Sequence, residues 1–354
     1  MVSIGGGLTV GVVRIVISFY SMASTPSPTP IQATTSPAKA APRKRAKAAP
    51  APVVTPKQFC ATIFPDTPLP DRFVTAVREI ERVLKGPVWL IVQDVPPARG
   101  RPTPPFHDMD DHVLRGFLDS RFTIPTKPIN VIIESPGGSA KIAYQLADLF
   151  RRHCGGFNVY VAEWAKSAAT LFVLGASNIY LSKYAEIGPL DVQVFDAERE
   201  DYCSALDEVQ ALERLNAFAL QAVDAGMLLL SSRSGKSVRT LLPLVHSFVS
   251  DMLRPLFEKL DTVHYTQMSR LLKVGEEYAV RLLERKYGHP RADEIARQLV
   301  NGYPEHGFYI GREESARIGI RTLDGDDDLE KALDEFKHAM HQLNVIGQLK
   351  EIKP

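Results

Sequence analysis

The sequence predicts an α/β fold built on a mostly parallel sheet. Short apolar segments rich in β-branched residues alternate with segments whose apolar residues recur at helical spacing. Such alternation is typical of βαβ units, whose parallel strands lie in one sheet. Between one strand and the next helix, the stretch IIESPGGSAK (132–141) holds two glycines after a proline. This is more backbone freedom than a plain turn needs, and it suits a loop that something must approach closely.

The predicted elements follow the chain in order. PDRFVTAVREIERVL (70–84) has helical spacing and an Asp in its first turn, and PVWLIVQ (87–93) is a short buried strand. The same criteria give helices at 109–120, 140–153 and 166–176, and strands at 129–134, 157–163 and 178–182. Residues 204–299 read as long helices without a convincing strand. A strand at 308–310, a helix at 312–320 and an amphipathic helix from 326 to 345 follow.

These elements divide the chain into three parts. Residues 56–325 form the main α/β domain with a helical insertion at about 204–299, and 326–354 form a C-terminal helix. Residues 1–55 are expected to be a disordered tail or to lie partly before the true start at Met22, so that residues 1–21 need not be present. The apolar run 8–20 contains Arg14, which disfavours a spanning helix. A membrane anchor through 8–20 is the alternative.

Composition excludes several classes of function. The 354 residues carry a formal net charge of +1, so no overall field indicates a nucleic-acid partner. Cys60, Cys154 and Cys203 lie far apart, which gives no disulfide framework and favours a reducing, cytoplasmic compartment. No spacing of His, Cys or acidic residues suggests a metal, and no cofactor is expected.

A second strand-to-helix turn contains a candidate nucleophile. Ser167 follows the strand end at AEWAK and opens an apolar helix with the small residues Ala168, Ala169 and Thr170. A serine at such a position is often only an N-cap, but a nucleophile also gains there from neighbouring N–H groups. Because consecutive parallel strands end at one edge of the sheet, the Gly-Gly turn can supply backbone donors beside Ser167.

The segments ESPGGS, AKSAATLFVLGASNIYLS and IGPLD together resemble the Clp protease and crotonase superfamily. Within it they are similar to the serine dehydrogenase proteinase group, which is related to signal peptide peptidase A. The resemblance covers about 88–194 and returns at YPEHGFYIGREESARIGI (303–320). It implies a spiral of repeated β-β-α units, with Ser167 as nucleophile and Gly137, Gly138 and Ala168 as oxyanion donors.

The general base departs from the patterns of these relatives. Where the Clp protease pattern has its His, this chain has Leu190-Asp191-Val192, and no lysine occurs between Lys183 and Lys236. His306 falls at or near the position of the Clp protease Asp. The two roles are therefore expected to be exchanged, with His306 as base and Asp191 orienting it. Lys236 is the alternative base, and the plain alternative is that Asp191 caps a turn and His306 is a loop residue.

Three functions remain open at this point. The first is a serine peptidase that binds extended polypeptide by strand addition. The second is a catalytically degenerate member that serves as an oligomeric interaction module, and the third is a crotonase-type acyl-CoA enzyme. The helices between about 209 and 283 carry apolar residues on more than one face, so a homo-oligomer is expected.

Overall fold

The computed structural model describes residues 57–95, 103–196 and 201–353. At the centre lies a sheet with the strand order β10-β2-β3-β4-β6, in which β10 is antiparallel and the others are parallel. The strands are Val88–Gln93 (β2), Ile129–Glu134 (β3), Phe157–Val161 (β4), Asn178–Leu181 (β6) and Asn344–Gly347 (β10). The predicted α/β class with a mostly parallel sheet is therefore confirmed. A spiral of β-β-α repeats stays a prediction.

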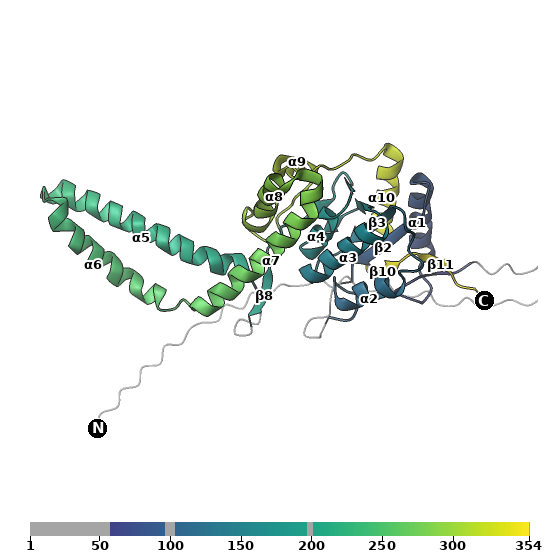
Figure 1. Cartoon of the computed structure of the whole chain (residues 1–354), viewed down its shortest axis with the longest axis horizontal. Helices are drawn as coiled ribbons and strands as arrows, with labels where there is room; N and C mark the ends of the chain where they lie inside the picture. The colour runs from purple at the N-terminus through teal and green to yellow at the C-terminus, as the bar shows by residue number, and fades with distance from the viewer. Residues whose placement is uncertain (1–56, 96–102, 197–200, 354) are drawn as a thin grey trace, which may run out of the picture. The chain divides into compact units, whose positions relative to one another are not determined.

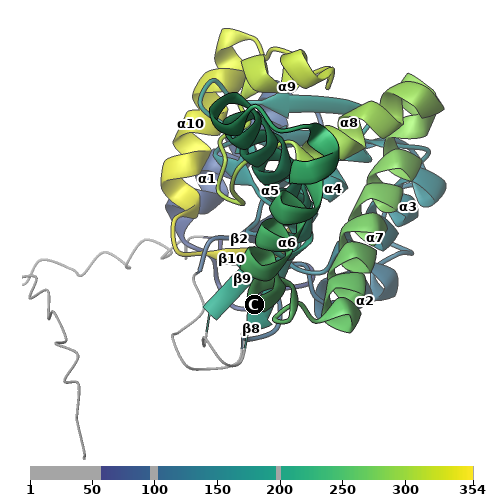
Figure 2. The same ribbon diagram turned by 90° about the vertical axis from the view of Figure 1, so that its left-hand side faces the viewer.

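Helices cover both faces of this sheet (Figures 1 and 2). Successive residues of a strand point to opposite faces. Leu90 accordingly lies in the core cluster with α1 and α10, whereas Ile91 lies in the larger cluster on the other face. The covering helices are Asp71–Val83 (α1) and Asp327–Met340 (α10) on one face, and Asp111–Asp119 (α2), Ala140–His153 (α3) and Ala168–Leu174 (α4) on the other. Helix α7 (Thr262–Tyr287) packs against α3 and α4.

Three pairs of short strands complete the fold around the sheet. They are Phe59–Ala61 (β1) with Leu349–Glu351 (β11), Trp164–Ala165 (β5) with Glu186–Ile187 (β7), and Gln193–Asp196 (β8) with Asp201–Ser204 (β9). The strand expected at 308–310 is reduced to a single bridge from Ile310 to Ile187, just before α9 (Arg312–Ile318). One backbone hydrogen bond joins these two residues, so the segment is fixed without becoming a full strand.

The prediction of one C-terminal helix over 326–354 is wrong beyond Met340. Gln342 has a φ of 59°, which breaks the helix, and Val345 and Ile346 then pair with β2 as part of β10. Both side chains are fully buried, and their β-branched shape favours a strand. The tail predicted for 1–55, the apolar run 8–20 and Met22 lie outside the described residues.

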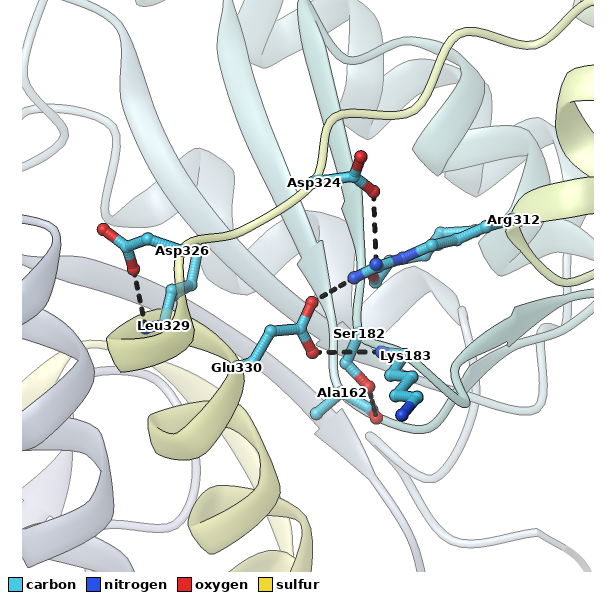
Figure 3. A network of polar contacts seen from close by, with 9 residues as sticks. Ala162, Ser182, Lys183, Arg312, Asp324, Asp326, Leu329 and Glu330 are labelled. Atoms are coloured by element: carbon cyan, nitrogen blue, oxygen red, sulfur yellow. Dashed lines mark hydrogen bonds and ion pairs between the residues drawn. The ribbon is translucent and has the colours of Figure 1, made fainter.

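A polar network fastens the start of α10 to the parallel sheet (Figure 3). Arg312 donates to the carbonyl of Leu181 at 2.6 Å and pairs with Asp324 and Glu330. Glu330 also accepts from the backbone N–H of Lys183 at 3.0 Å. The C-terminal segment is therefore tied to β6 through Arg312 and to β2 through the pairing of β10.

The region predicted as helical contains α5 (Ala205–Ser234), α6 (Val238–Phe257), α7 and α8 (His289–Asn301). α5 packs on α6 and on α7, and α7 packs on α8. By length and composition alone, α5 could cross a membrane, since one 18-residue window has a mean hydropathy of 1.3 and is not buried. Of the helices in the described residues, it alone passes this test.

Candidate active site

Ser167 occupies a strained turn between β5 and α4. Its φ of 50° and ψ of −120° lie in a region that non-glycine residues rarely adopt. Strain of this kind occurs at functional sites, where surrounding contacts hold it. The Ser167 side chain makes no capping hydrogen bond to α4. The N-cap reading of this serine is therefore not supported, and its hydroxyl is available for other chemistry.

The Gly-Gly turn lies directly against this serine. Gly137 and Gly138 have φ values of 107° and 127°. A Cβ at Gly137 would lie 2.7 Å from the Lys166 carbonyl oxygen and 2.8 Å from Ser167 Cβ. A Cβ at Gly138 would lie 2.7 Å from the backbone nitrogen of Met109. Both positions therefore require glycine for two reasons, the backbone conformation and the lack of space.

Backbone geometry distinguishes the two glycines as oxyanion donors. The Gly137 N–H donates to Ser135 Oγ at 3.2 Å, so it is already engaged within its own loop. Within the described residues, the N–H groups of Gly138 and Ala168 have no acceptor. Gly138 and Ala168 also line the pocket that contains Ser167. This arrangement favours the N–H groups of Gly138 and Ala168 as the donors of an oxyanion hole. Gly137 has no side chain, which allows the two turns to lie in direct contact.

The Gly-Gly turn is braced by two buried polar residues, Gln93 and Ser135, which no sequence pattern marks as functional. Gln93, at the end of β2, accepts from Ser135 Oγ at 2.6 Å. Its amide nitrogen donates to the carbonyls of Phe106 at 3.0 Å and Asp108 at 2.5 Å. The segment from 106 to 109 in turn bonds to the turn, because the Met109 N–H donates to the Gly137 carbonyl at 2.6 Å. Since buried polar groups must be paired, removing Gln93 would leave several groups unsatisfied.

Glu134 supports the chain that leads to Ser167. Its buried carboxyl group accepts from the backbone N–H groups of Ala162, Glu163 at 3.0 Å and Trp164 at 2.8 Å. Burial raises the pKa of Glu134 to about 8, and these three N–H groups oppose the rise. A glutamate at the end of a strand gives no distinguishing signal in the sequence, so this role too was not predicted.

A pocket of about 460 Å³ opens in front of Ser167. It also contains Asp191 and His306, which lie far apart in sequence. The pocket, called here the Ser167 pocket, is lined by residues of both turns and by polar and apolar residues of other segments. Its lining residues are Pro136, Gly138, Ser139, Ala140, Lys141, Ser167, Ala168, Leu171, Leu190, Asp191, Val192, Gln193, Leu271, Val274, Gly275 and His306.

Asp191 and His306 face each other within this pocket. The distance from His306 Nδ1 to Asp191 Oδ2 is 3.9 Å, and Nδ1 is buried without a hydrogen-bond partner. Asp191 accepts from Ser204 Oγ at 2.9 Å and from Gln193 Nε2 at 3.0 Å. These bonds fix the carboxylate, and a small movement of the imidazole would complete a hydrogen bond to it. Catalytic hydrogen bonds are often this long in unliganded sites.

The electrostatics of this pair suit a general base. Burial lowers the pKa of His306, the Asp191 charge opposes this, and nearby Lys166 lowers the pKa further. Burial likewise raises the pKa of Asp191, against the hydrogen bond from Ser204 and the His306 charge. An imidazole with a lowered pKa is neutral at physiological pH and can take a proton from a hydroxyl.

Two lysines are relevant to the general base: Lys166, which precedes Ser167, and Lys236, the alternative base expected from the sequence. Lys166 Nζ forms an ion pair with Glu186 at 2.8 Å, which engages its charge. Lys236 lies in the loop between α5 and α6, is exposed, and does not line the Ser167 pocket. Among residues 57–95, 103–196 and 201–353, no group of His, Cys, Asp and Glu is arranged to hold a metal ion.

Known proteins share this sequence pattern. The family of ClpP-like SDH-type serine proteinases matches residues 99–259. Two uncharacterised proteins of Methanocaldococcus jannaschii are also similar. One is 26% identical over 272 residues, 75% of this chain and 77% of the relative, and the other is 26% identical over 194 residues, 55% of this chain and 53% of that relative. The resemblance expected from the Gly-Gly turn and Ser167 is thus confirmed for residues 99–259, which match the ClpP-like SDH-type serine proteinases.

Proposed function

We propose that this protein is a serine peptidase in which Ser167 is the nucleophile, His306 the general base and Asp191 the residue that orients His306. The observation that carries the proposal is the conformation of Ser167. Ser167 has a φ of 50°, and its hydroxyl makes no capping hydrogen bond, so neither feature helps to begin α4. Ser167 lines a pocket together with His306 and Asp191. The family match supports a protease-type function.

The reaction would follow the usual course of acyl transfer. Neutral His306 takes the Ser167 proton as Oγ attacks the peptide carbonyl, and the N–H groups of Gly138 and Ala168 bind the oxygen that becomes negative. His306 then gives the proton to the leaving amine. The acyl-enzyme is released by a water molecule, which His306 activates in the same way.

The proposed substrate is an extended polypeptide. Gly138 and Ser139 border the Ser167 pocket, and so do Val192 and Gln193. An extended chain between these segments could form strand-like hydrogen bonds with either one. Leu171, Leu190 and Val274 among the lining residues favour an apolar substrate side chain.

A fluorophosphonate probe, which reacts with activated serines, tests this proposal. We expect the wild-type protein to be labelled, Ser167→Ala and His306→Ala to lose labelling equally, and Lys236→Ala to keep it. Hydrolysis of an unfolded protein such as casein should follow the same order. A wild-type protein that neither reacts with the probe nor cleaves casein would instead support the degenerate interaction module. Labelling that is lost in Lys236→Ala but kept in His306→Ala would identify Lys236, and not His306, as the general base.

A further inference from the structure

The hairpin formed by α5 and α6, residues 205–257, leaves much apolar surface uncovered. Figure 1 shows the two helices joined as a hairpin. They pack together around the buried residues Val245, Val249 and Leu253. More than half of the exposed large apolar side chains in the described residues belong to these two helices. Examples along the hairpin are Phe218, Leu220, Leu228, Leu244, Phe248 and Met252. An apolar surface of this extent marks an interaction site.

The exposed side chains are arranged for packing against another helical surface. On α6, Leu244, Phe248 and Met252 recur every fourth residue and so lie on one side of the helix. Phe248 is 68% exposed and Leu244 is 61% exposed. On α5, residues 215–230 are apolar around the whole circumference except for a few polar side chains, among them Asp224. Helices of this kind are buried in a larger assembly or in a bilayer.

The charges of the hairpin are separated along its length. Residues 225–250, called here the tip, carry Arg233, Lys236 and Arg239 and no Asp or Glu. All three cations are exposed, and none forms an ion pair within the part of the chain that the structure describes. Residues 205–224, called here the base, carry a carboxylate excess of Asp207, Glu208, Glu213 and Asp224 over the single cation Arg214.

We propose that a second copy of this chain covers the hairpin, with the two hairpins packed antiparallel about a twofold axis. The apolar surfaces then form a four-helix bundle, in which both copies use the same patch. The tip of each copy lies beside the base of the other. This brings Arg233 and Lys236 close to carboxylates such as Glu213, whereas a parallel arrangement would bring the cationic tips together.

The same observations disfavour a bilayer as the partner. If α5 spanned a membrane, Asp224 would lie in the middle of its apolar segment, and α6 would carry Arg239 and Asp251 into lipid. If only the tip touched an anionic bilayer, Phe218 and Leu220 near the base would remain exposed to water. A second copy accounts for the whole length of the apolar surface, and pairing does not require that Ser167 is catalytic.

Complementary charge reversal tests the antiparallel geometry in the full-length protein. One variant reverses the tip (Arg233→Glu, Lys236→Glu, Arg239→Glu), and another reverses the base (Asp207→Lys, Glu213→Lys, Asp224→Lys). By sedimentation and light scattering we expect wild-type particles of at least twice the 39.2 kDa chain mass. Each variant alone should be monomeric. An equimolar mixture should recover the paired species, because opposite charges again meet at both ends.

A matched control and two contrary outcomes complete the test. Arg72→Glu, Arg115→Glu and Lys127→Glu change the net charge as the tip variant does but lie outside the hairpin, so this protein should stay associated. Circular dichroism checks that all variants are folded. A monomeric wild-type protein, or one whose association neither reversal weakens, overturns the proposal. If the wild type is monomeric and sediments with phosphatidylglycerol vesicles through its tip, the surface binds lipid instead.

Discussion

Replacing Gly137 by alanine should separate the geometry of the active site from the stability of the fold. The new Cβ would lie within 3.0 Å of the Lys166 carbonyl oxygen, Ser167 Cβ and the Ala168 nitrogen. These atoms belong to the backbone or its first side-chain carbon, so no flexible side chain can move aside. The two turns must separate, and Ser167 moves with them. A displacement approaching 1 Å at a catalytic group costs about 100-fold in rate.

Gly155→Ala is the matched control for this prediction. Gly155 has a φ of 71°, but a Cβ there would meet no atom within 4 Å. Both substitutions impose backbone strain of about 1–3 kcal/mol, which denaturant unfolding should detect in each variant. Only Gly137→Ala should slow the second-order rate of fluorophosphonate labelling, by about 100-fold. Labelling of Gly137→Ala at the wild-type rate would show that close contact between the turns does not position the nucleophile.

Three further predictions concern protons and buried polar groups. Because the pKa of His306 is lowered, the labelling rate should reach half its maximum below pH 6.5, and a midpoint above that value would contradict His306 as base. In the folded protein Glu134 stays protonated up to about pH 8, whereas in the unfolded chain its pKa has the ordinary value of 4.5. The free energy of unfolding should therefore fall between these pH values, by at most about 1.4 kcal/mol per unit, and Glu134→Gln should flatten the slope in chemical denaturation. Gln93→Ala should lower the unfolding free energy by about 1–3 kcal/mol by stranding buried partners, and slow labelling; unchanged values for both would refute its bracing role.

Local patterns in the sequence were sufficient for the parallel strands and for both turns. The β-branched runs ending at Gln93 and Glu134 give buried strands, and glycine content marks the turn at 137–138. The C-terminal strand was missed because the amphipathic pattern of α10 continues past Met340, and only pairing with β2 decides where the helix ends.

The polar residues that support the site could not be predicted for a related reason. Glutamine and glutamate at strand ends are usually solvated, and only the folded chain brings Gln93 against Ser135 and Glu134 beneath 162–164. The same holds for the Gly137 N–H, whose partner is a side chain two residues earlier. Conversely, Asp191 and His306 were selected by resemblance to a family pattern, and the structure brings them within 3.9 Å. Their catalytic roles stay predictions.

The position of β10 has a consequence for how the protein is made. Synthesis runs from the N-terminus, so β2 and the turns around Ser167 emerge long before residues 344–347, which cover the edge of β2. Gln93, whose amide braces the Gly-Gly turn, lies opposite Asn344 in that last pairing. An uncovered strand edge invites pairing with other chains until it is closed. Nascent and truncated chains that lack β10 would therefore expose the edge of β2 beside Gln93. The pairing that closes this edge of the sheet is thus made late in synthesis, and it lies beside the residue that braces the Gly-Gly turn.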